Sequence, residues 1–152
     1  CRTAWGRNQF VRLKSGAEMI FDGYNANPDS MSALLENMKV LRARGRKIGV
    51  FGQMRELGDL SSSLHEELGK KVAMASFAKV YFVGPDHEAF HRGMQAGGFR
   101  GATHLAEDYS NALGQQLAAA IHEGDLILVK GSRGMRLERF VESCEPLDFQ
   151  KK

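Results

Sequence analysis

The chain has 152 residues, 43% of them hydrophobic and 26% charged, which is the size and balance of one globular domain with an ordinary core. Seventeen glycines, three prolines and the lack of a repeated period exclude collagen-like, solenoid and disordered classes. A net charge of +3 is too small for a nucleic-acid binder by bulk charge, so we expect no nucleic-acid partner. No apolar run approaches the roughly 20 residues needed to cross a bilayer, which predicts no membrane segment.

The two ends of the chain predict a piece of a longer cytoplasmic protein. The first residue is Cys1 rather than Met, and no basic-then-apolar leader follows it, so we expect a missing N-terminal partner domain. The only other cysteine, Cys144, lies near the opposite end, so the pair makes neither a metal-binding spacing nor a disulfide framework. A reducing compartment, the cytoplasm, is the expected location.

The first part of the chain predicts a β-hairpin followed by a helix. Residues 9–13 and 18–21 read as two short strands joined by a glycine-containing turn. Asn27 is a good N-cap and Pro28 a good first helical residue. Apolar residues follow at helical spacing, which predicts a helix over about 28–43.

The rest of the chain alternates short apolar strands with helices. Strands are predicted at 47–51, 79–83, 102–105 and 125–130. Helices are predicted from a capping box at Ser63–Glu66, from an Asp86 cap to about Gly97, along Tyr109 to Ile121, and around Leu137 to Val141. This alternation implies a Rossmann-like three-layer α/β domain, with a mostly parallel sheet covered on both faces and an N-terminal β-hairpin.

The predicted topology gives a location for a ligand site. In parallel sheets ligands bind at the carboxyl ends of the strands, where helix N-termini offer unpaired N–H groups. Four loops are therefore expected to share one rim: 22–28, 52–58, 84–86 and 130–134. Topology alone names this rim but not its ligand.

The turn that begins at Asp22 has two interpretations. In the first, Asp22 accepts from the hydroxyls of a sugar, and Asn25 both donates to and accepts from a polar ligand. In the second, Asn27 caps the helix, Asn25 closes the turn and Asp22 is solvated. The residues by themselves leave these interpretations about level.

A zinc site is an alternative function. His87–His91 matches H-E-x-x-H, in which two histidines one helical turn apart bind zinc. Met94 occupies the glycine position of the extended motif, and Gly93 weakens the helix, so we favour an exposed short helix with no metal. We interpret His65 and His122 as surface helix residues rather than bases.

The chain contains neither G-x-G-x-x-G nor G-x-x-x-x-G-K-[ST] and is not expected to hold ATP alone. Its turn at 131–134 resembles the backbone-gripping turn of KH modules, a weak signal that we interpret as a tight turn after a buried strand. No Ser/His/Asp order or Cys/His pair supports nucleophilic hydrolysis.

Three strings of residues together carry a family resemblance. They are Tyr24-Asn25-Ala26-Asn27-Pro28-Asp29-Ser30-Met31, then Gly52-Gln53-Met54-Arg55-Glu56-Leu57-Gly58 with Leu64-His65 after it, then Lys130-Gly131-Ser132-Arg133. In this order the chain resembles the C-terminal domain of the Mur ligases, most closely of the MurF type. It departs from the pattern where Phe21 replaces a common acid and where Phe51-Gly52-Gln53 replaces Leu-Gly-Asp.

The resemblance implies the last domain of a three-domain cytoplasmic enzyme of peptidoglycan synthesis. In such an enzyme ATP phosphorylates a carboxylate of UDP-N-acetylmuramoyl-tripeptide, and the amine of D-alanyl-D-alanine attacks the acyl phosphate to form an amide. The central domain would hold most of the ATP and Mg²⁺ site. Residues 1–8 would be the linker from that domain, and residues 9–152 would close over ATP and present the amino substrate.

The resemblance also implies site residues, none of them catalytic or metal-binding in this chain, which alone is expected to be inactive. Those implied to bind the nucleotide are Arg7, Asp22, Asn25 and Asn27, and those implied to bind substrate are Arg55, Glu56, Lys130 and Ser132. In the full enzyme, Ala at Asp22 or Arg7 is expected to weaken ATP use and leave the fold intact. A non-catalytic nucleotide-binding module is a further alternative.

Overall fold

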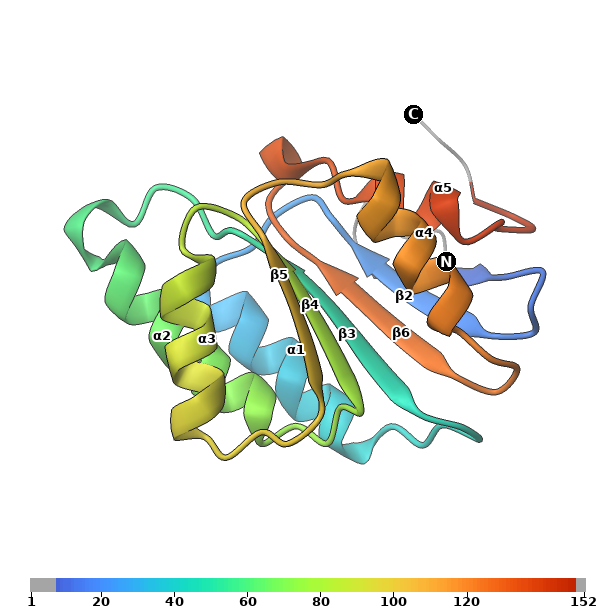
Figure 1. Ribbon diagram of the computed structural model, residues 1–152, viewed down its shortest axis with the longest axis horizontal. Helices are drawn as coiled ribbons and strands as arrows, with labels where there is room; N and C mark the ends of the chain where they lie inside the picture. Colours follow the sequence, from blue (N-terminus) through green and yellow to red (C-terminus); the bar gives the residue numbers. More distant parts are fainter. Residues whose placement is uncertain (1–7, 150–152) are drawn as a thin grey trace.

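The computed structural model describes residues 8–149, in which a six-stranded sheet lies between two layers of helices (Figure 1). In chain order the strands and helices are β1 (Gln9–Arg12), β2 (Glu18–Asp22), α1 (Pro28–Val40), β3 (Lys47–Gly52), η1 (Gly58–Leu60), α2 (Ser61–Ala73), β4 (Lys79–Val83), α3 (His87–Ala96), β5 (Ala102–Ala106), α4 (Asn111–Ala120), β6 (Leu126–Lys130), η2 (Arg133–Met135) and α5 (Glu138–Ser143). The elements η1 and η2 are single 3₁₀ turns. The predicted α/β alternation is confirmed.

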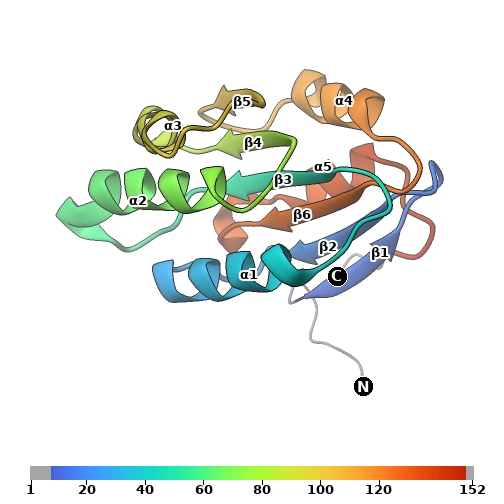
Figure 2. The same cartoon turned by 90° about the horizontal axis from the view of Figure 1, so that it is seen from below.

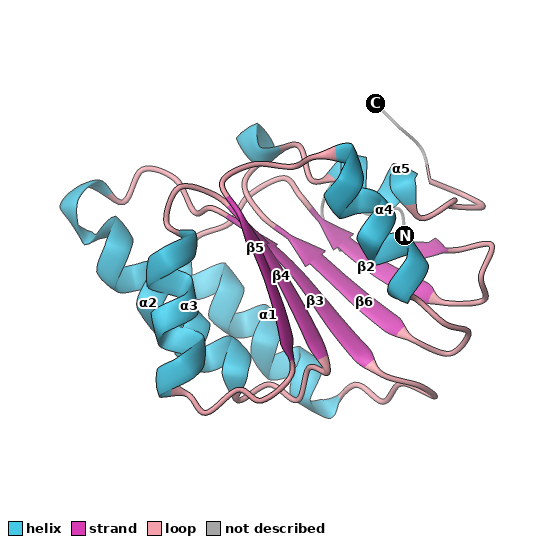
Figure 3. Cartoon of the chain, viewed as in Figure 1, coloured by secondary structure: helices cyan, strands magenta, loops and turns pink. Residues whose placement is uncertain are grey.

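The strand order is β1-β2-β6-β3-β4-β5. Only β1 runs antiparallel, because a tight hairpin joins it to β2, and the other neighbouring strands are parallel. Figure 3 shows the arrowheads of the parallel strands pointing toward one edge of the sheet. Every residue of β6 is buried, as expected for a central strand of a sheet covered on both faces.

Helices α1, α2 and α3 cover one face of the sheet, and α4 and α5 cover the other (Figure 2). Each face has its own core, built around Phe51, Phe82 and Phe90 on one side and around Phe21 and Phe140 on the other. The three layers therefore follow from strands whose side chains alternate between two apolar faces. Within residues 8–149 no helix has the length and apolar character needed to span a membrane.

The start of α1 forms as its sequence predicts. The Asn27 side chain accepts a hydrogen bond from Ser30 N–H at 2.8 Å, and the Ser30 hydroxyl accepts one from Asn27 N–H at 3.1 Å. Pro28 occupies the first helical position, where a missing N–H has no consequence. The helix ends at Val40, three residues before the predicted end.

Of two predicted caps, Ser63 is misplaced, and Asp86 holds the predicted N-cap position of α3 without a capping hydrogen bond. The helix α2 begins at Ser61, so Ser63 lies inside it and its hydroxyl donates to the Leu60 carbonyl rather than capping the helix. Asp86 precedes α3, but its carboxylate makes no capping hydrogen bond. The Ser63 hydroxyl is thus used within its own turn, whereas the Asp86 carboxylate is used by tertiary contacts with Gln53 and Ser61 that a local pattern does not contain.

Close packing of α2 against α3 depends on two glycines. A Cβ added at Gly93 would overlap the carbonyl oxygen of Glu66, and one added at Gly69 would lie 2.9 Å from the Met94 backbone nitrogen. Gly93 therefore lets the two helix backbones approach each other, and it does not end α3, which continues to Ala96.

Gly93→Ala is expected to lower the free energy of unfolding by about 1 to 3 kcal/mol, because the added methyl group overpacks a backbone contact. Alanine favours an isolated helix over glycine by about 1 kcal/mol, so helix propensity alone predicts the opposite sign. Urea denaturation measures the difference, with Gln95→Ala on the exposed face of α3 as the control. A stability equal to or above that of the unmodified chain would contradict the close contact.

Candidate functional site

The predicted rim forms at the carboxyl ends of the parallel strands. The register places Asp22 beside Lys130 and Gly52 beside Val83, so the loops that follow these strands start at the same edge. Gly131 N–H donates to the Asp22 carbonyl at 3.2 Å, which joins the loops at 22–28 and 130–134. The loops at 52–58 and 84–86 are joined by Gln53, as described below. All four expected loops therefore meet at one edge.

Lys130 is the most enclosed charged group of this rim. Its side chain is 2% exposed, and its Nζ donates to Asp22 Oδ2 at 3.0 Å and to the Asn25 carbonyl at 3.0 Å. A buried ammonium is tolerated only when it is paired and hydrogen-bonded. Lys130 therefore ties the end of β6 to the turn at 22–28, and its charge is directed into the protein.

The two interpretations of the turn at 22–28 can now be compared with its geometry. Asn27 uses its side chain as the helix cap, as the second interpretation predicts. Asp22 is paired with Lys130 and 13% exposed, so the prediction that it is solvated is wrong. Asn25 is exposed, its carbonyl is held by Lys130, and its side-chain amide makes no hydrogen bond within residues 8–149. The turn thus presents the amide of Asn25 outward from a fixed backbone.

His65 is the centre of a second polar cluster at the rim. It is fully buried, so its predicted position on the surface is wrong. Its Nε2 accepts the Met54 N–H at 2.9 Å, and its Nδ1 lies 2.7 Å from the Ser61 carbonyl, to which a protonated Nδ1 donates. These partners assign the neutral tautomer with the proton on Nδ1. Burial lowers the pKa of His65, which favours the same neutral form.

Asp86 connects this cluster to the loop after β4. Its Oδ2 accepts from the Gln53 amide and from the Ser61 hydroxyl, both at 2.5 Å, and its N–H donates back to Gln53 Oε1 at 3.0 Å. Burial alone raises the pKa of Asp86, but the hydrogen bonds from Ser61 and Gln53 outweigh burial, and the pKa lies below its ordinary value. The carboxylate is therefore charged and holds three segments of the rim together.

Arg55 and Glu56 project from the loop that this cluster holds. Both are exposed, and Glu56 has a φ of 62°, a left-handed conformation that is uncommon for a residue with a side chain. The Arg55 guanidinium lies against Gly134, in the space that a side chain at that position would fill. Arg55 thus reaches from the loop after β3 to the loop after β6.

The loop after β6 contributes a hydroxyl and a second cation. Ser132 is 7% exposed, and its Oγ has no hydrogen-bond partner among the described residues. The Arg133 guanidinium lies over the Tyr24 ring, 5.6 Å from its centroid. The rim therefore places cations and hydrogen-bonding groups side by side, a combination suited to an anionic, polar ligand.

The structure thus collects most of the predicted site residues. Lys130 touches both Asp22 and Asn25, and Arg55 lies against the loop that contains Ser132. Arg7 lies outside the described residues. Sequence reasoning missed the cluster of Gln53, Ser61, His65 and Asp86, whose members come from the loop after β3, from α2 and from the loop after β4 and share no local pattern.

The zinc alternative gains no support from the geometry. His87 and His91 lie on α3 as the motif predicts. No group of three or more His, Cys, Asp or Glu residues among positions 8–149 is arranged to hold a metal ion.

The predicted place of His122 on a helix is wrong. It follows the end of α4, and its Nδ1 is 3.3 Å from the Arg46 guanidinium.

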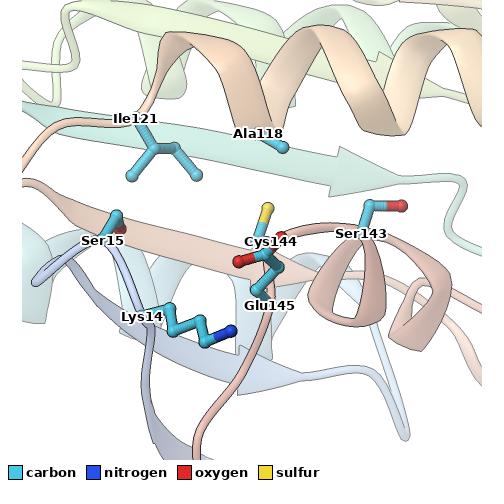
Figure 4. A pocket seen from close by; sticks show the side chains of 7 residues that line it. All are labelled: Lys14, Ser15, Ala118, Ile121, Ser143, Cys144 and Glu145. Carbon is cyan, nitrogen blue, oxygen red and sulfur yellow. The ribbon is translucent and has the colours of Figure 1, made fainter.

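A cavity of about 400 Å³ lies away from the rim, beside the β1–β2 turn (Figure 4). Its lining residues are Lys14, Ser15, Ala118, Ile121, Ser143, Cys144 and Glu145. Burial raises the pKa of Cys144 to about 12, so this thiol is protonated at neutral pH and is a poor nucleophile. None of the predicted site residues that the structure describes lines this cavity.

Comparison with known proteins defines the class. The family described as "Mur ligase, glutamate ligase domain" matches residues 6–133, and the chain belongs to this family. The chain is 34% identical over 145 residues to the UDP-N-acetylmuramoyl-tripeptide--D-alanyl-D-alanine ligase of Bacillus subtilis (strain 168), covering 90% of this chain and 30% of that protein. It is 38% identical over 128 residues to the ligase of the same name from Treponema pallidum (strain Nichols), covering 84% of this chain and 27% of that protein.

A solved structure agrees with these relatives. The chain superimposes on the MurF ligase of Thermotoga maritima in complex with ADP with a TM-score of 0.76 and 31% identity, covering 95% of this chain and 31% of the other. The six-stranded, mostly parallel sheet with its N-terminal hairpin is therefore the fold of a Mur ligase C-terminal domain. The chain spans less than one third of the length of these relatives.

The Asp22–Lys130 pair also changes an expectation about variants. Replacing either partner alone leaves a charge or a polar group enclosed without its counterpart, so Asp22→Ala is now expected to destabilise the fold as well as any ligand site. Lys130→Met is expected to lower the free energy of unfolding by about 3 to 5 kcal/mol.

The pair is tested by a double-mutant cycle of Asp22→Asn, Lys130→Met and the double variant, measured by urea denaturation. We expect a coupling free energy on the order of 1 to 3 kcal/mol, because the partners are in contact and shielded from water. Additive single effects, or an unchanged stability of Lys130→Met, would show that the ammonium is not held by Asp22.

Proposed function

We propose that this chain is the C-terminal domain of an ATP-dependent ligase that joins D-alanyl-D-alanine to UDP-N-acetylmuramoyl-tripeptide. The names of the relatives and the ADP complex of the Thermotoga maritima MurF ligase support this proposal. In the proposed arrangement residues 1–8 link a central ATPase domain to the domain formed by residues 9–152. With these substrates the enzyme is proposed to act in the cytoplasm, at a step of peptidoglycan synthesis.

The observation that carries the proposal is the structure of the rim. Its buried charged groups hold the loops in place, and Asn25 and Arg55 on those loops are exposed. The amide of Asn25 and the N-terminus of α1, capped by Asn27, are suited to a nucleotide on a neighbouring domain. Asp22 keeps one carboxylate oxygen beyond its bond to Lys130 and is proposed to accept from a ribose hydroxyl. Arg7 is proposed to reach the phosphates.

The loop after β3 and the loop after β6 form the other half of the rim, which is proposed to receive the amino substrate. D-Alanyl-D-alanine carries one free carboxylate, and Arg55 offers an exposed guanidinium for it. Glu56 lies next to it and is suited to the substrate's ammonium group. Ser132 has a buried hydroxyl without a partner among the described residues, which is proposed to bond the substrate, and Lys130 contributes by holding the backbone of the turn at 22–28.

These residues present and shield the substrates while the reaction proceeds. The amine nitrogen forms a bond to the acyl carbon, the bond from that carbon to the phosphate oxygen breaks, and the amine loses a proton as phosphate leaves. Closing the domain over the acyl phosphate excludes water, which would otherwise hydrolyse it. ATP and Mg²⁺ are proposed to be held mainly by the central domain, because residues 8–149 contain no cluster of three or more His, Cys, Asp or Glu residues arranged to hold a metal ion.

The full-length protein tests this function. Phosphate release from ATP is expected to require both UDP-N-acetylmuramoyl-tripeptide and D-alanyl-D-alanine. Arg55→Ala is expected to raise the KM for D-alanyl-D-alanine, and Arg7→Ala the KM for ATP, each by about 10- to 100-fold, the effect of losing one charge-assisted hydrogen bond.

The two arginine variants serve as controls for each other, because each is expected to leave the other substrate's KM near its unmodified value. Nucleotide binding without any turnover would support the non-catalytic module and contradict the ligase. Equal effects of both variants on both substrates would contradict the division of the rim into two halves.

A further inference from the structure

The loop that carries Arg55 and Glu56 is anchored at its first two residues. Gln53 N–H donates to the Val83 carbonyl at 3.0 Å, and the Gln53 side chain both donates to and accepts from Asp86. Met54 is 1% exposed and gives its N–H to His65. The chain is thus fixed immediately before Arg55, and the projection of the following residues depends on this anchor.

His65 supplies the hydrogen-bond acceptor for the Met54 N–H, which pairs with no backbone carbonyl of the described residues. The Met54 N–H is buried and needs an acceptor, and the one it finds is the Nε2 of a side chain on α2. The His65 ring is in turn fixed by the Ser61 carbonyl on one side and by an edge-to-face contact with Phe82, with 5.8 Å between ring centroids. A single orientation of the ring therefore sets the path of the loop.

We propose that His65 is a positioning residue for the amino substrate: it holds the Met54 N–H and so places Arg55 across the rim against the loop after β6. This inference rests on the proposed function. His65 touches no reacting atom, because it is fully enclosed beneath the loop. It acts only through the backbone of Met54.

The chemistry of the ring fits this role. A protonated His65 would carry hydrogen on both nitrogens and would lose the acceptor that Met54 uses. Burial lowers the pKa of His65, so the ring keeps its acceptor at neutral pH. The charged group that faces the ring is Asp86, with Oδ2 3.4 Å from Nδ1, and Asp86 is already held by Gln53 and Ser61.

A positioning role and a purely structural role make different predictions. If His65 only stabilises the fold, replacing it lowers stability and leaves the KM values unchanged. If it positions Arg55, the KM for the amino substrate rises while the KM for ATP does not, because Asn25 and Asp22 belong to the separately held turn. An acceptor at the same place is then expected to restore the KM.

The experiment compares the unmodified full-length protein with His65→Leu, His65→Gln and Leu117→Ala. Leucine fills the space without an acceptor, whereas the glutamine Oε1 can replace Nε2. Leu117 is fully buried on the opposite face of the sheet, so its truncation is a control that loses stability without touching the loop. The readouts are the KM values for D-alanyl-D-alanine and ATP, and amide hydrogen exchange in peptides covering residues 53–60.

We expect His65→Leu to raise the KM for D-alanyl-D-alanine about ten-fold, to leave the KM for ATP within about two-fold, and to speed exchange in residues 53–60. His65→Gln is expected to recover most of both effects, and Leu117→Ala to show neither. If His65→Leu does not fold, His65→Asn replaces it, because its shorter side chain does not reach Met54.

The inference is overturned if His65→Leu shows unchanged exchange in residues 53–60, if its KM values match those of Leu117→Ala, or if glutamine gives no recovery. Failure of the proposed function is a separate result, namely the absence of ligation by the unmodified protein. In that case the exchange measurement still decides whether His65 holds the loop.

Discussion

A lysine ammonium cannot be buried without partners, and the site follows from how Lys130 meets this requirement. Lys130 ends the central strand β6, and its two partners, the Asp22 carboxylate and the Asn25 carbonyl, come from the neighbouring strand and the turn after it. Satisfying one charge therefore fixes the turn at 22–28 relative to the sheet. The start of α1 then follows from its own cap at Asn27.

The loops after β3 and β4 are also fixed by enclosed polar groups, but here the groups are neutral or anionic. Asp86 and His65 hold the loop after β3, and Gln53 joins it to the loop after β4. In both parts of the rim the enclosed polar groups bind the chain to itself, whereas Asn25 and Arg55 remain exposed. This division separates residues that build the site from residues that are free to contact a ligand.

The sequence predicts the fold well because the signals for it are local. Apolar runs mark the parallel strands, Asn27 and Pro28 mark the start of α1, and the topology alone predicts which loops meet.

The polar clusters could not be predicted in this way. Asp22 and Lys130 are 108 residues apart, and Gln53 and Asp86 are 33 apart, so no local pattern shows their contact. A helix start three residues earlier than the capping-box motif predicts, at Ser61 instead of Leu64, accompanies the burial of His65. The roles of the site residues and the boundary at residue 8 stay predictions.

The arrangement of this rim can be tested by a crystal structure of the full-length protein with ADP and D-alanyl-D-alanine bound. We expect the nucleotide within hydrogen-bond distance of Asn25 and the dipeptide carboxylate on Arg55. We also expect the Lys130 ammonium to stay on Asp22 and the Asn25 carbonyl and to touch neither ligand. A Lys130 side chain turned outward onto a ligand, or ligands bound at another edge of the sheet such as the cavity beside Cys144, would contradict this arrangement.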